Sequence, residues 1–455
     1  MKIFVLGAVR ALSAKAKSGP KTVADKTGKN VVFVDGVRTP FLQSGTDFLH
    51  LLPHELARHS LLSLLQKTEI PKHEVQYVMY GTVVQDPKTS NVAREASLCA
   101  GFPEGVPAHT VTQACISANQ AITSAVGMIS VGMADCIVCG GVEVLSNIPI
   151  GHSKRLRSLY FSWNKAKTFY QKLAVLSQIR PNFFIPDLPA IAEFSTGETM
   201  GHSADRLAAA FKVTREEQDE YALRSHTLAA EAQEKGYLND IAPYMVPQTG
   251  KVIEKDNGIR VSTKERLAQL KPAFVKPYGS VTAANASFLT DGASACLIMS
   301  EAKAKALGLK PKAYLRSFVY KSQDPVDRLL LAPADCIAST LNSANLTLGD
   351  IDVWELHEAF AGQVLANLRA MESDYYCKSF IRLPGKIGQL DVSKLNNWGG
   401  SLSIGHPFAA TGTRLCTHAA NRMIREDGHL AIVAACAAGG QGVGMLMERH
   451  PDGKV

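Results

Sequence analysis

The feature that most constrains the fold of this chain is an internal repeat of helix-then-strand units. In the first half, apolar residues at three- and four-residue spacing over 55–65 predict an amphipathic helix, which a strand ending in glycine follows at 75–81. In the second half, a helical pattern at 337–341 precedes a strand at 350–356. A second unit, a helix from Cys115 with a strand at 136–141, returns as a helix at 412–424 with a strand at 430–435. The repetition predicts two similar α/β halves in one chain.

Alternating helices and strands favour mostly parallel sheets covered by helices. We assign 30–150 and 273–302 to the N-terminal half, because the apolar segment at 291–299 reads as one of its core strands, and 303–455 to the C-terminal half. The less regular region 151–272 between them is expected to be an inserted loop domain, with a helix at 214–235. Ligands bind beyond the carboxyl ends of strands in open α/β sheets, so a duplicated fold can turn two such ends toward one pocket.

The N-terminus has the composition of a targeting segment. No acidic residue precedes Asp25, whereas five basic residues and several apolar ones occur before it. This pattern predicts a mitochondrial presequence over 1–29, with a disordered basic tail as the alternative. The chain of 455 residues contains no apolar run long enough to span a bilayer. Its net charge of +8 suits acidic ligands or anionic surfaces, and no nucleic-acid-binding motif is recognisable, so no nucleic-acid partner is expected.

The nine cysteines do not form a metal-binding pattern. Cys136 and Cys139 make a C-x-x-C, but a zinc site would need a second ligand pair at a suitable spacing, and the sequence offers none. We interpret the segment as a buried strand with small side chains, with a metal site or a redox dithiol as the alternative. No disulfide is required, which favours a reducing compartment.

Three segments carry residues suited to acyl transfer. Cys115 lies at the predicted start of a helix, where the positive end of the helix dipole would lower the thiol pKa and favour a thiolate. His406 lies in a Gly-His-Pro loop, and Cys436 lies at the end of a strand before a glycine-rich loop. Each residue alone could be structural. Because Cys115 and Cys436 lie on equivalent sides of the two repeated units and His406 introduces the second unit, we expect the three residues to share one pocket. Together they would combine a nucleophile with proton transfer.

These segments resemble the signatures of the thiolase family, and the resemblance extends from about residue 30 to the end of the chain. It implies a thiolase-like fold with a layered α-β-α-β-α core. It also implies that Cys115 is the nucleophile, that His406 is its activating base, and that Cys436 is the acid and base for the departing carbanion and the incoming CoA. Backbone N–H groups of Cys115 and Ala438 would form one oxyanion hole.

The chain departs from the family pattern at two positions. Ala438 stands where the family usually has glycine, which puts the close backbone approach there in doubt. His357-Glu-Ala-Phe stands where many thiolases have Asn-Glu-Ala-Phe, whose Asn holds a water near the thioester oxygen. An imidazole can also hold water or donate directly, so His357 is retained as a catalytic candidate, with a structural role as the alternative. By position, Ser287 matches a CoA-contacting loop, Met200 matches the acyl pocket, and Phe360 faces that pocket or belongs to the core.

The residue at 357 and other segments resemble thiolases of the trifunctional-protein type. This implies thiolytic cleavage of long-chain 3-ketoacyl-CoA by CoA, the last step of fatty-acid β-oxidation. CoA would be a substrate, with no cofactor and no metal. The expected partners are acyl-CoA and CoA, a second copy in a homodimer, and an α subunit carrying hydratase and dehydrogenase activities, in mitochondria at the inner membrane. The alternatives are a biosynthetic acetoacetyl-CoA thiolase and a non-catalytic lipid carrier.

The segment 152–186 contains seven Lys or Arg residues and no Asp or Glu. On a helical wheel, one side carries the basic residues Lys154, Arg157, Lys165 and Lys172, and the other carries the apolar residues Leu156, Leu159, Trp163, Ala166, Tyr170 and Leu173. This pattern predicts a helix lying in an anionic membrane interface. The alternative is a helix docked on the protein itself or on a partner.

Overall fold

The computed structural model describes residues 21–23, 28–189 and 192–454. The predicted presequence, 1–29, lies largely outside the described residues. Within them, the core is one long mixed sheet with the strand order β10-β11-β12-β9-β1-β8-β5-β3-β4, and β2 pairs with β8. The strands are β1 (Val31–Arg38), β2 (Leu42–Gln43), β3 (Tyr77–Gly81), β4 (Ala108–Val111), β5 (Cys136–Glu143), β8 (Thr290–Ser300), β9 (Ala313–Ser322), β10 (Val353–Leu356), β11 (Leu430–Ala437) and β12 (Gln441–Arg449).

The sheet repeats one arrangement twice. The neighbours β3-β5-β8-β1 in the first half correspond to β10-β11-β12-β9 in the second, with the same parallel and antiparallel pairings. The halves join where β1 pairs with β9 at Val32↔Tyr314 and Phe33↔Ala313. The duplication predicted from the sequence is therefore confirmed, and the apolar segment at 291–299 is the fully buried strand β8.

The expectation of mostly parallel sheets is wrong. Among the strand pairs in the described part of the chain, only β3–β4, β3–β5 and β10–β11 are parallel. After β11 the chain turns back at once through residues 438–440 into β12, and a direct hairpin makes its two strands antiparallel. In the first half, β8 likewise lies antiparallel beside β5, although the long region 151–272 lies between these two strands in the chain.

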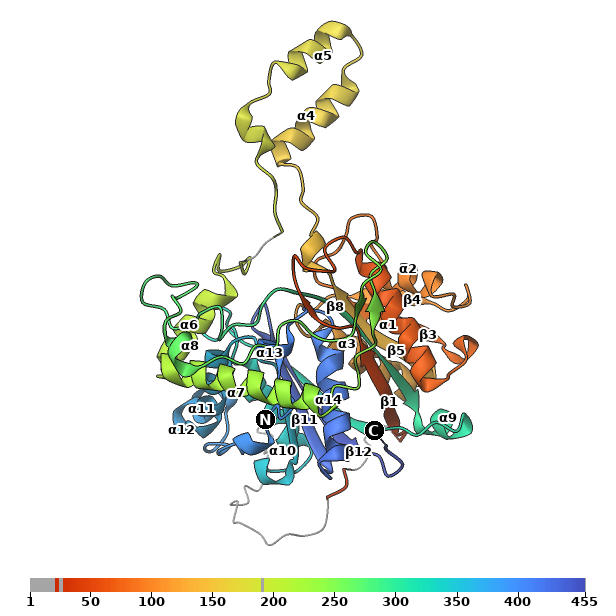
Figure 1. Cartoon of the computed structure of the whole chain (residues 1–455), viewed down its shortest axis with the longest axis vertical. Helices are drawn as coiled ribbons and strands as arrows, with labels where there is room; N and C mark the ends of the chain where they lie inside the picture. Colours follow the sequence, from red (N-terminus) through yellow and green to blue (C-terminus); the bar gives the residue numbers. More distant parts are fainter. Residues whose placement is uncertain (1–20, 24–27, 190–191, 455) are drawn as a thin grey trace, which may run out of the picture.

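Helices form layers on the sheet (Figure 1). The helices α3 (Ser117–Ser130) and α14 (Thr411–Arg425) contact each other and strands of both halves. Gly412 allows this contact, because a Cβ atom there would lie 2.2 Å from Asn119 Oδ1. The helix α1 (Pro53–Thr68) packs on β1, β5 and β8, and α10 (Ala332–Ser343) packs on β9, β11 and β12. The arrangement agrees with the layered α/β fold expected from the resemblance.

The helices α6 (Met200–Ala210) and α7 (Arg215–Glu234) pack against α11 (Ala361–Glu372), so this part of the region between the halves lies on the C-terminal half. The helix predicted at 214–235 is confirmed as α7. The other α-helices are α2 (Val92–Cys99), α8 (Lys264–Ala268), α9 (Glu301–Ala306), α12 (Asp374–Tyr376) and α13 (Ser401–Ile404), with a hairpin of β6 (Tyr244–Met245) and β7 (Val252–Ile253). Short 3₁₀ turns occur at Lys72–Glu74, Leu145–Asn147, Pro181–Phe184, Leu348–Asp350 and Val392–Lys394, and a π turn at Cys377–Ile381.

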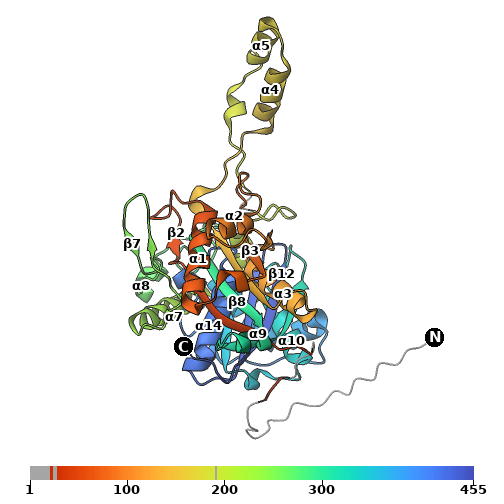
Figure 2. The same cartoon turned by 90° about the vertical axis from the view of Figure 1, so that its right-hand side faces the viewer.

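The basic segment forms an arm that projects from the body of the molecule (Figures 1 and 2). It contains α4 (Lys154–Lys165) and α5 (Phe169–Leu176), and its two legs pair at Gly151 and Asp187. The prediction of a single amphipathic helix is wrong, because the chain turns at 166–168 and the apolar residues separate into two groups. Leu156, Leu159 and Trp163 pack inside the hairpin against Val175, whereas Tyr170 and Leu173 are exposed. No helix in the described part of the chain is both long enough and apolar enough to cross a membrane.

Candidate active site

Cys115 lies in a tight loop between β4 and α3. The helix begins at Ser117, so the prediction that Cys115 starts the helix is wrong by two residues. Ala114 has a φ of 46°, a left-handed conformation that reverses the chain just before the cysteine. The Ser117 hydroxyl donates to the Ala114 carbonyl at 2.7 Å and accepts from the Gln113 N–H at 2.8 Å, which holds this loop in shape. The thiol is partly buried and free.

The expectation of a lowered pKa for Cys115 is also wrong for the free protein. Burial raises the pKa of this thiol to about 12, and the nearby Glu143 carboxyl acts in the same direction. The backbone N–H groups of Ala438 and of Cys115 itself interact with the sulfur and oppose the increase. A thiol in this state would act as a nucleophile only with a base that takes its proton.

His406 follows α13 in a loop that several contacts hold in place. The backbone N–H of His406 donates to Thr290 Oγ1 at 2.9 Å. Gly405 adopts a φ of 110°, and the Thr290 side chain leaves no room for a Cβ atom there. The Thr411 hydroxyl donates to the Pro407 carbonyl at 3.0 Å, so its oxygen accepts from His406 Nδ1, 2.7 Å away. His406 Nε2 is then the unprotonated nitrogen, and it is buried with no partner in the described structure. Burial, with the Arg414 charge, lowers the pKa of His406 to about 3.

His357 follows the end of β10 and lies beside His406. The two ring centroids are 4.2 Å apart. Nδ1 of His357 lies 3.0 Å from Ser401 Oγ, and its Nε2 is buried without a partner among the described atoms. Burial holds the pKa of His357 well below its ordinary value, and the nearby His406 and Arg414 act in the same direction. The ring is therefore neutral.

The ligating atoms of Cys115, His357 and His406 lie within 4.8 Å of one another. Strands of both halves thus bring together residues far apart in the sequence. Sulfur and imidazole nitrogen are also atoms that Zn²⁺ binds, so the geometry alone would admit a soft metal ion. The sequence-based expectation that no metal takes part stays a prediction.

Cys436 occupies the penultimate position of β11, opposite Gly442 of β12. Its thiol is buried, and its pKa is raised by that burial and by the neighbouring Cys115. Ala438 follows in the β11–β12 turn, where the glycines at 439 and 440 take positive φ values of 79° and 69°. Since the Ala438 N–H interacts with the Cys115 sulfur, alanine in place of glycine still permits the close backbone approach.

Of the three candidate binding residues, Ser287 and Phe360 lie in segments that contact each other next to His357, and Met200 begins α6. The backbone N–H of Ser287 donates to the Ala359 carbonyl at 2.9 Å, which ties its loop to the His357 loop. Phe360 is buried and forms an edge-to-face pair with Phe274, with ring centroids 6.1 Å apart. Met200, at the start of α6, packs at the margin of the same apolar cluster.

Sequence reasoning missed several residues that hold the catalytic loops. Glu143, at the end of β5, is fully buried and accepts from the N–H groups of Val83, Val84 and Ala409, so it links the first half to the His406 loop. Gln113 Nε2 donates to Gln441 Oε1 at 2.9 Å and links the Cys115 loop to the Cys436 loop. No motif marks these residues, because their partners are backbone groups or side chains distant in sequence.

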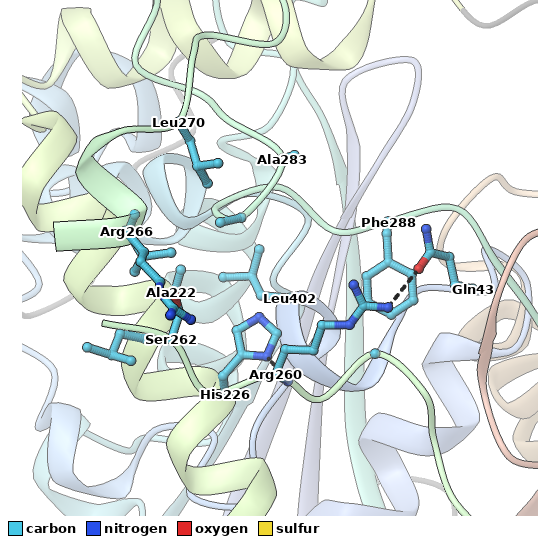
Figure 3. Close-up of a pocket in the computed structure, with 14 residues that line it drawn as sticks. Gln43, Ala222, His226, Arg260, Ser262, Arg266, Leu270, Ala283, Phe288 and Leu402 are labelled. Carbon is cyan, nitrogen blue, oxygen red and sulfur yellow. Dashed lines mark hydrogen bonds between the residues drawn. The ribbon is translucent and has the colours of Figure 1, made fainter. Parts of the chain in front are cut away.

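A pocket of about 400 Å³ is lined by residues of α7 and α13 and of the loop that contains Phe288 (Figure 3). Its lining contains no acidic residue, and His226, Arg260 and Arg266 supply nitrogen-bearing side chains. Burial and the adjacent Arg260 lower the pKa of His226 to about 4, so this imidazole is neutral near pH 7. Phe288 lines the pocket, and the next residue, Leu289, pairs with His406. One wall of the pocket is therefore continuous in the chain with the residue that pairs with His406.

The sequence matches the models of the thiolase N-terminal domain over residues 31–302 and of the thiolase C-terminal domain over residues 309–449. The chain belongs to the thiolase family, whose members are acyltransferases. Among its relatives, the mitochondrial trifunctional enzyme subunit beta of Bos taurus is 58% identical over 443 residues, which cover 97% of this chain and 93% of the relative. A probable 3-ketoacyl-CoA thiolase of Caenorhabditis elegans is 56% identical over 445 residues, 98% of each chain.

Solved structures agree with this assignment. Human mitochondrial 3-ketoacyl-CoA thiolase in complex with CoA superposes with a TM-score of 0.79 at 29% identity, covering 93% of this chain and 98% of that one. The acetyl-CoA acetyltransferase of Bacillus anthracis superposes with a TM-score of 0.78 at 34% identity, covering 93% and 99%. The family predicted from the motifs is therefore confirmed.

Proposed function

We propose that this protein cleaves long-chain 3-ketoacyl-CoA with a second CoA, the last step of fatty-acid β-oxidation, through an acyl-enzyme on Cys115. The observation that carries the proposal is the convergence of the Cys115 sulfur with the His357 and His406 ring nitrogens within 4.8 Å. A nucleophile, a base and a hydrogen-bond donor around one buried point are the groups that acyl transfer needs.

In the first half-reaction, His406 Nε2 takes the thiol proton while the Cys115 sulfur attacks the 3-keto carbon. The bond between C2 and C3 then breaks, the acyl chain stays on Cys115, and Cys436 gives its proton to C2 to release acetyl-CoA. In the second, the Cys436 thiolate takes the proton of the incoming CoA thiol, whose sulfur attacks the acyl group. Cys115 leaves as the thiolate and regains its proton from His406.

Oxygen atoms that become negative during these steps have two sets of donors. The N–H groups of Cys115 and Ala438 flank the sulfur and suit one tetrahedral oxyanion. His357 and the protonated His406 suit the thioester oxygen of the acetyl-CoA part, because both Nε2 atoms are unpartnered and their rings lie together.

CoA itself would occupy the pocket beside Phe288. Arg260 and Arg266 suit its phosphates, since guanidinium groups bind phosphate oxygens in a bidentate manner. Ser287 precedes Phe288 of the pocket, and its backbone N–H bonds to the Ala359 carbonyl near His357, which supports contact with the pantetheine part. Met200 and Phe360 would border the acyl chain.

The projecting arm supports contact with an anionic membrane surface. Among its exposed residues are the basic Lys154, Arg157 and Lys165 and the aromatic Phe161, Phe169 and Tyr170, of which Tyr170 is 81% exposed. Large apolar side chains on an extended hairpin remain costly in water unless a partner or a lipid interface covers them. Each basic residue near anionic lipid could contribute about 1 kcal/mol.

Partners and location follow from the relatives. The mitochondrial trifunctional enzyme subunit beta is by name one subunit of a larger enzyme, which supports an α subunit as partner here. Hydratase and dehydrogenase activities on that subunit are what the family resemblance implies. The names of the same relatives support a mitochondrial location. The inner membrane as the site and a homodimer of this chain are further parts of the proposal, which the resemblance implies. Co-purification with the α subunit, followed by mass determination, would test both assemblies.

Steady-state cleavage of 3-ketoacyl-CoAs with acyl chains of four to sixteen carbons tests the activity. We expect kcat/KM to rise with chain length. A maximum for acetoacetyl-CoA would instead favour the biosynthetic reaction, and no cleavage of any length would exclude thiolysis. The same protein assayed for acetyl-CoA condensation provides the comparison.

A further inference from the structure

One buried chain of polar groups stands behind His357 and is not used by the reaction scheme above. Ser401 Oγ lies 3.0 Å from His357 Nδ1 and accepts a hydrogen bond from Arg414 Nη2 at 2.9 Å. All three side chains are almost completely inaccessible to water. Behind them, Arg414 lies 3.6 Å from Glu355, whose other oxygen is paired with Arg422 at 2.7 Å.

The direction of these bonds follows from the groups. A guanidinium only donates, so the Ser401 oxygen accepts from Arg414. The described structure offers the Ser401 hydroxyl no acceptor besides His357 Nδ1. If Nδ1 carried the proton, that hydroxyl would be left without an acceptor in a dry environment, which is unfavourable. The hydroxyl therefore donates to Nδ1, and the ring proton is on Nε2.

This tautomer is the opposite of the one at His406, where Nδ1 donates to Thr411 and Nε2 is bare. The two rings, 4.2 Å apart, thus offer different groups to the same space, a proton acceptor from His406 and a proton donor from His357. Both rings are neutral, because burial and the Arg414 charge oppose protonation.

We propose that Ser401, oriented by Arg414, is a positioning residue that fixes His357 as the Nε2–H tautomer and so makes it a hydrogen-bond donor to the substrate. The inference rests on the proposed function, since it supplies the donor that the thioester oxygen requires. It differs from a merely structural role, because the contribution of Ser401 passes through the imidazole of His357 alone.

The test compares Ser401→Ala with Ser401→Thr and with Ser403→Ala as the matched control. Ser403 is equally buried in α13, but its hydroxyl bonds to Gly400 and Ser225 and not to a catalytic residue. With the full-length protein and a 3-ketoacyl-CoA that the native protein cleaves, Ser401→Ala should lower kcat about 10-fold to 100-fold with KM changed less than about twofold. Ser401→Thr keeps the hydroxyl and should restore most of the activity, and Ser403→Ala should stay within about twofold of the native rate.

A double-mutant cycle with His357→Asn separates positioning from structure. An amide has a fixed donor nitrogen and no tautomer to select, so Ser401→Ala should cost less than about twofold in that background. An equal loss in the native and His357→Asn backgrounds would overturn the inference, and so would full activity of Ser401→Ala. If the native protein cleaves no 3-ketoacyl-CoA, the proposed function and the inference that rests on it are both wrong, whereas cleavage by the native protein without the Ser401 effect overturns the inference alone.

Discussion

At the scale of single residues, burial holds the thiol of Cys115 and the imidazole of His406 in their neutral forms. The pKa of the thiol is raised to about 12, whereas that of the imidazole is lowered to about 3. An ion pair between them is therefore not the resting state, and in the proposed mechanism proton transfer accompanies attack. The free protein should show no loss of kcat/KM from His406 protonation until the pH falls toward 3, well below the ordinary imidazole range.

Replacing Cys115 by Ser should leave the fold intact and abolish acyl transfer. The two side chains have similar volume, but a hydroxyl is a far weaker nucleophile, so kcat should fall by about 10³-fold or more. Mass spectrometry after mixing with 3-ketoacyl-CoA should detect the acyl-enzyme in the native protein only. Turnover of the Ser variant near the native rate would show that another residue is the nucleophile.

Replacing Cys436 by Ser should impair proton transfer more than acylation. Exchange of the α-protons of acetyl-CoA with solvent should slow by about 10²-fold to 10⁴-fold, because that step needs a positioned base. Exchange is followed by NMR in D₂O, and acylation of Cys115 is measured in parallel. Unchanged exchange would reassign the role to His406 or His357.

At the scale of elements, the arm of α4 and α5 has a small apolar cluster of its own and a separate exposed aromatic surface. Leu156, Leu159 and Val175 hold the two helices together, whereas Phe161, Phe169 and Tyr170 face outward. Variants of the outer residues should therefore change binding without unfolding the hairpin. Basic residues attract anionic lipid in a manner that salt screens, whereas apolar insertion persists at high salt.

The triple replacement of Phe161, Phe169 and Tyr170 by Ser should weaken flotation with anionic vesicles, most visibly at high ionic strength. Deletion of 154–180 should weaken it further, and cleavage of short 3-ketoacyl-CoA should stay largely native in both. Tyr278→Ser is the matched control, since Tyr278 is 92% exposed but lies outside the arm. Equal flotation of native and deleted proteins would leave docking on the α subunit as the role of the arm.

At the scale of the whole molecule, a few buried polar contacts join the two halves around the active site. Glu143 accepts N–H groups from the loop after β3 and from the His406 loop, and Gly141 beside it leaves no room for a Cβ against the Ala409 carbonyl. Burial raises the pKa of Glu143 to about 7, against an ordinary value of 4.5. The joint between the halves is thus sensitive to pH near neutrality.

The pKa of Glu143 is higher in the folded state, about 7, than its ordinary value of 4.5, which applies to the unfolded chain. Protonation of Glu143 therefore stabilises the folded state. This stabilisation is complete below about pH 4.5 and is lost as the pH rises through about 7. The whole difference amounts to roughly 3 kcal/mol in the free energy of unfolding. Glu143→Gln removes this titrating carboxyl. The free energy of unfolding of the native protein, relative to that of the variant, should therefore fall as the pH rises from 5 to 8.5. Thermal unfolding of both proteins across that range measures the effect, and a difference independent of pH would contradict it.

The sequence by itself determined the repeated α/β units, the thiolase family and the candidates Cys115, His406 and Cys436, because these depend on local periodicity and on short motifs. It also determined that the arm is basic and amphipathic. The local pattern did not specify three features that depend on how the chain packs. These are the strand direction after β11, the start of α3 two residues after Cys115, and the turn at 166–168.

Only the tertiary structure decided the protonation chemistry. The pKa of a thiol depends on burial as well as on its place near a helix end, and burial prevails at Cys115. The tautomers of His357 and His406 depend on Ser401, Arg414 and Thr411, whose hydrogen bonds form only after the loops around them have folded together. A motif specifies which residue is present, whereas the partners that set its proton are distributed over the fold.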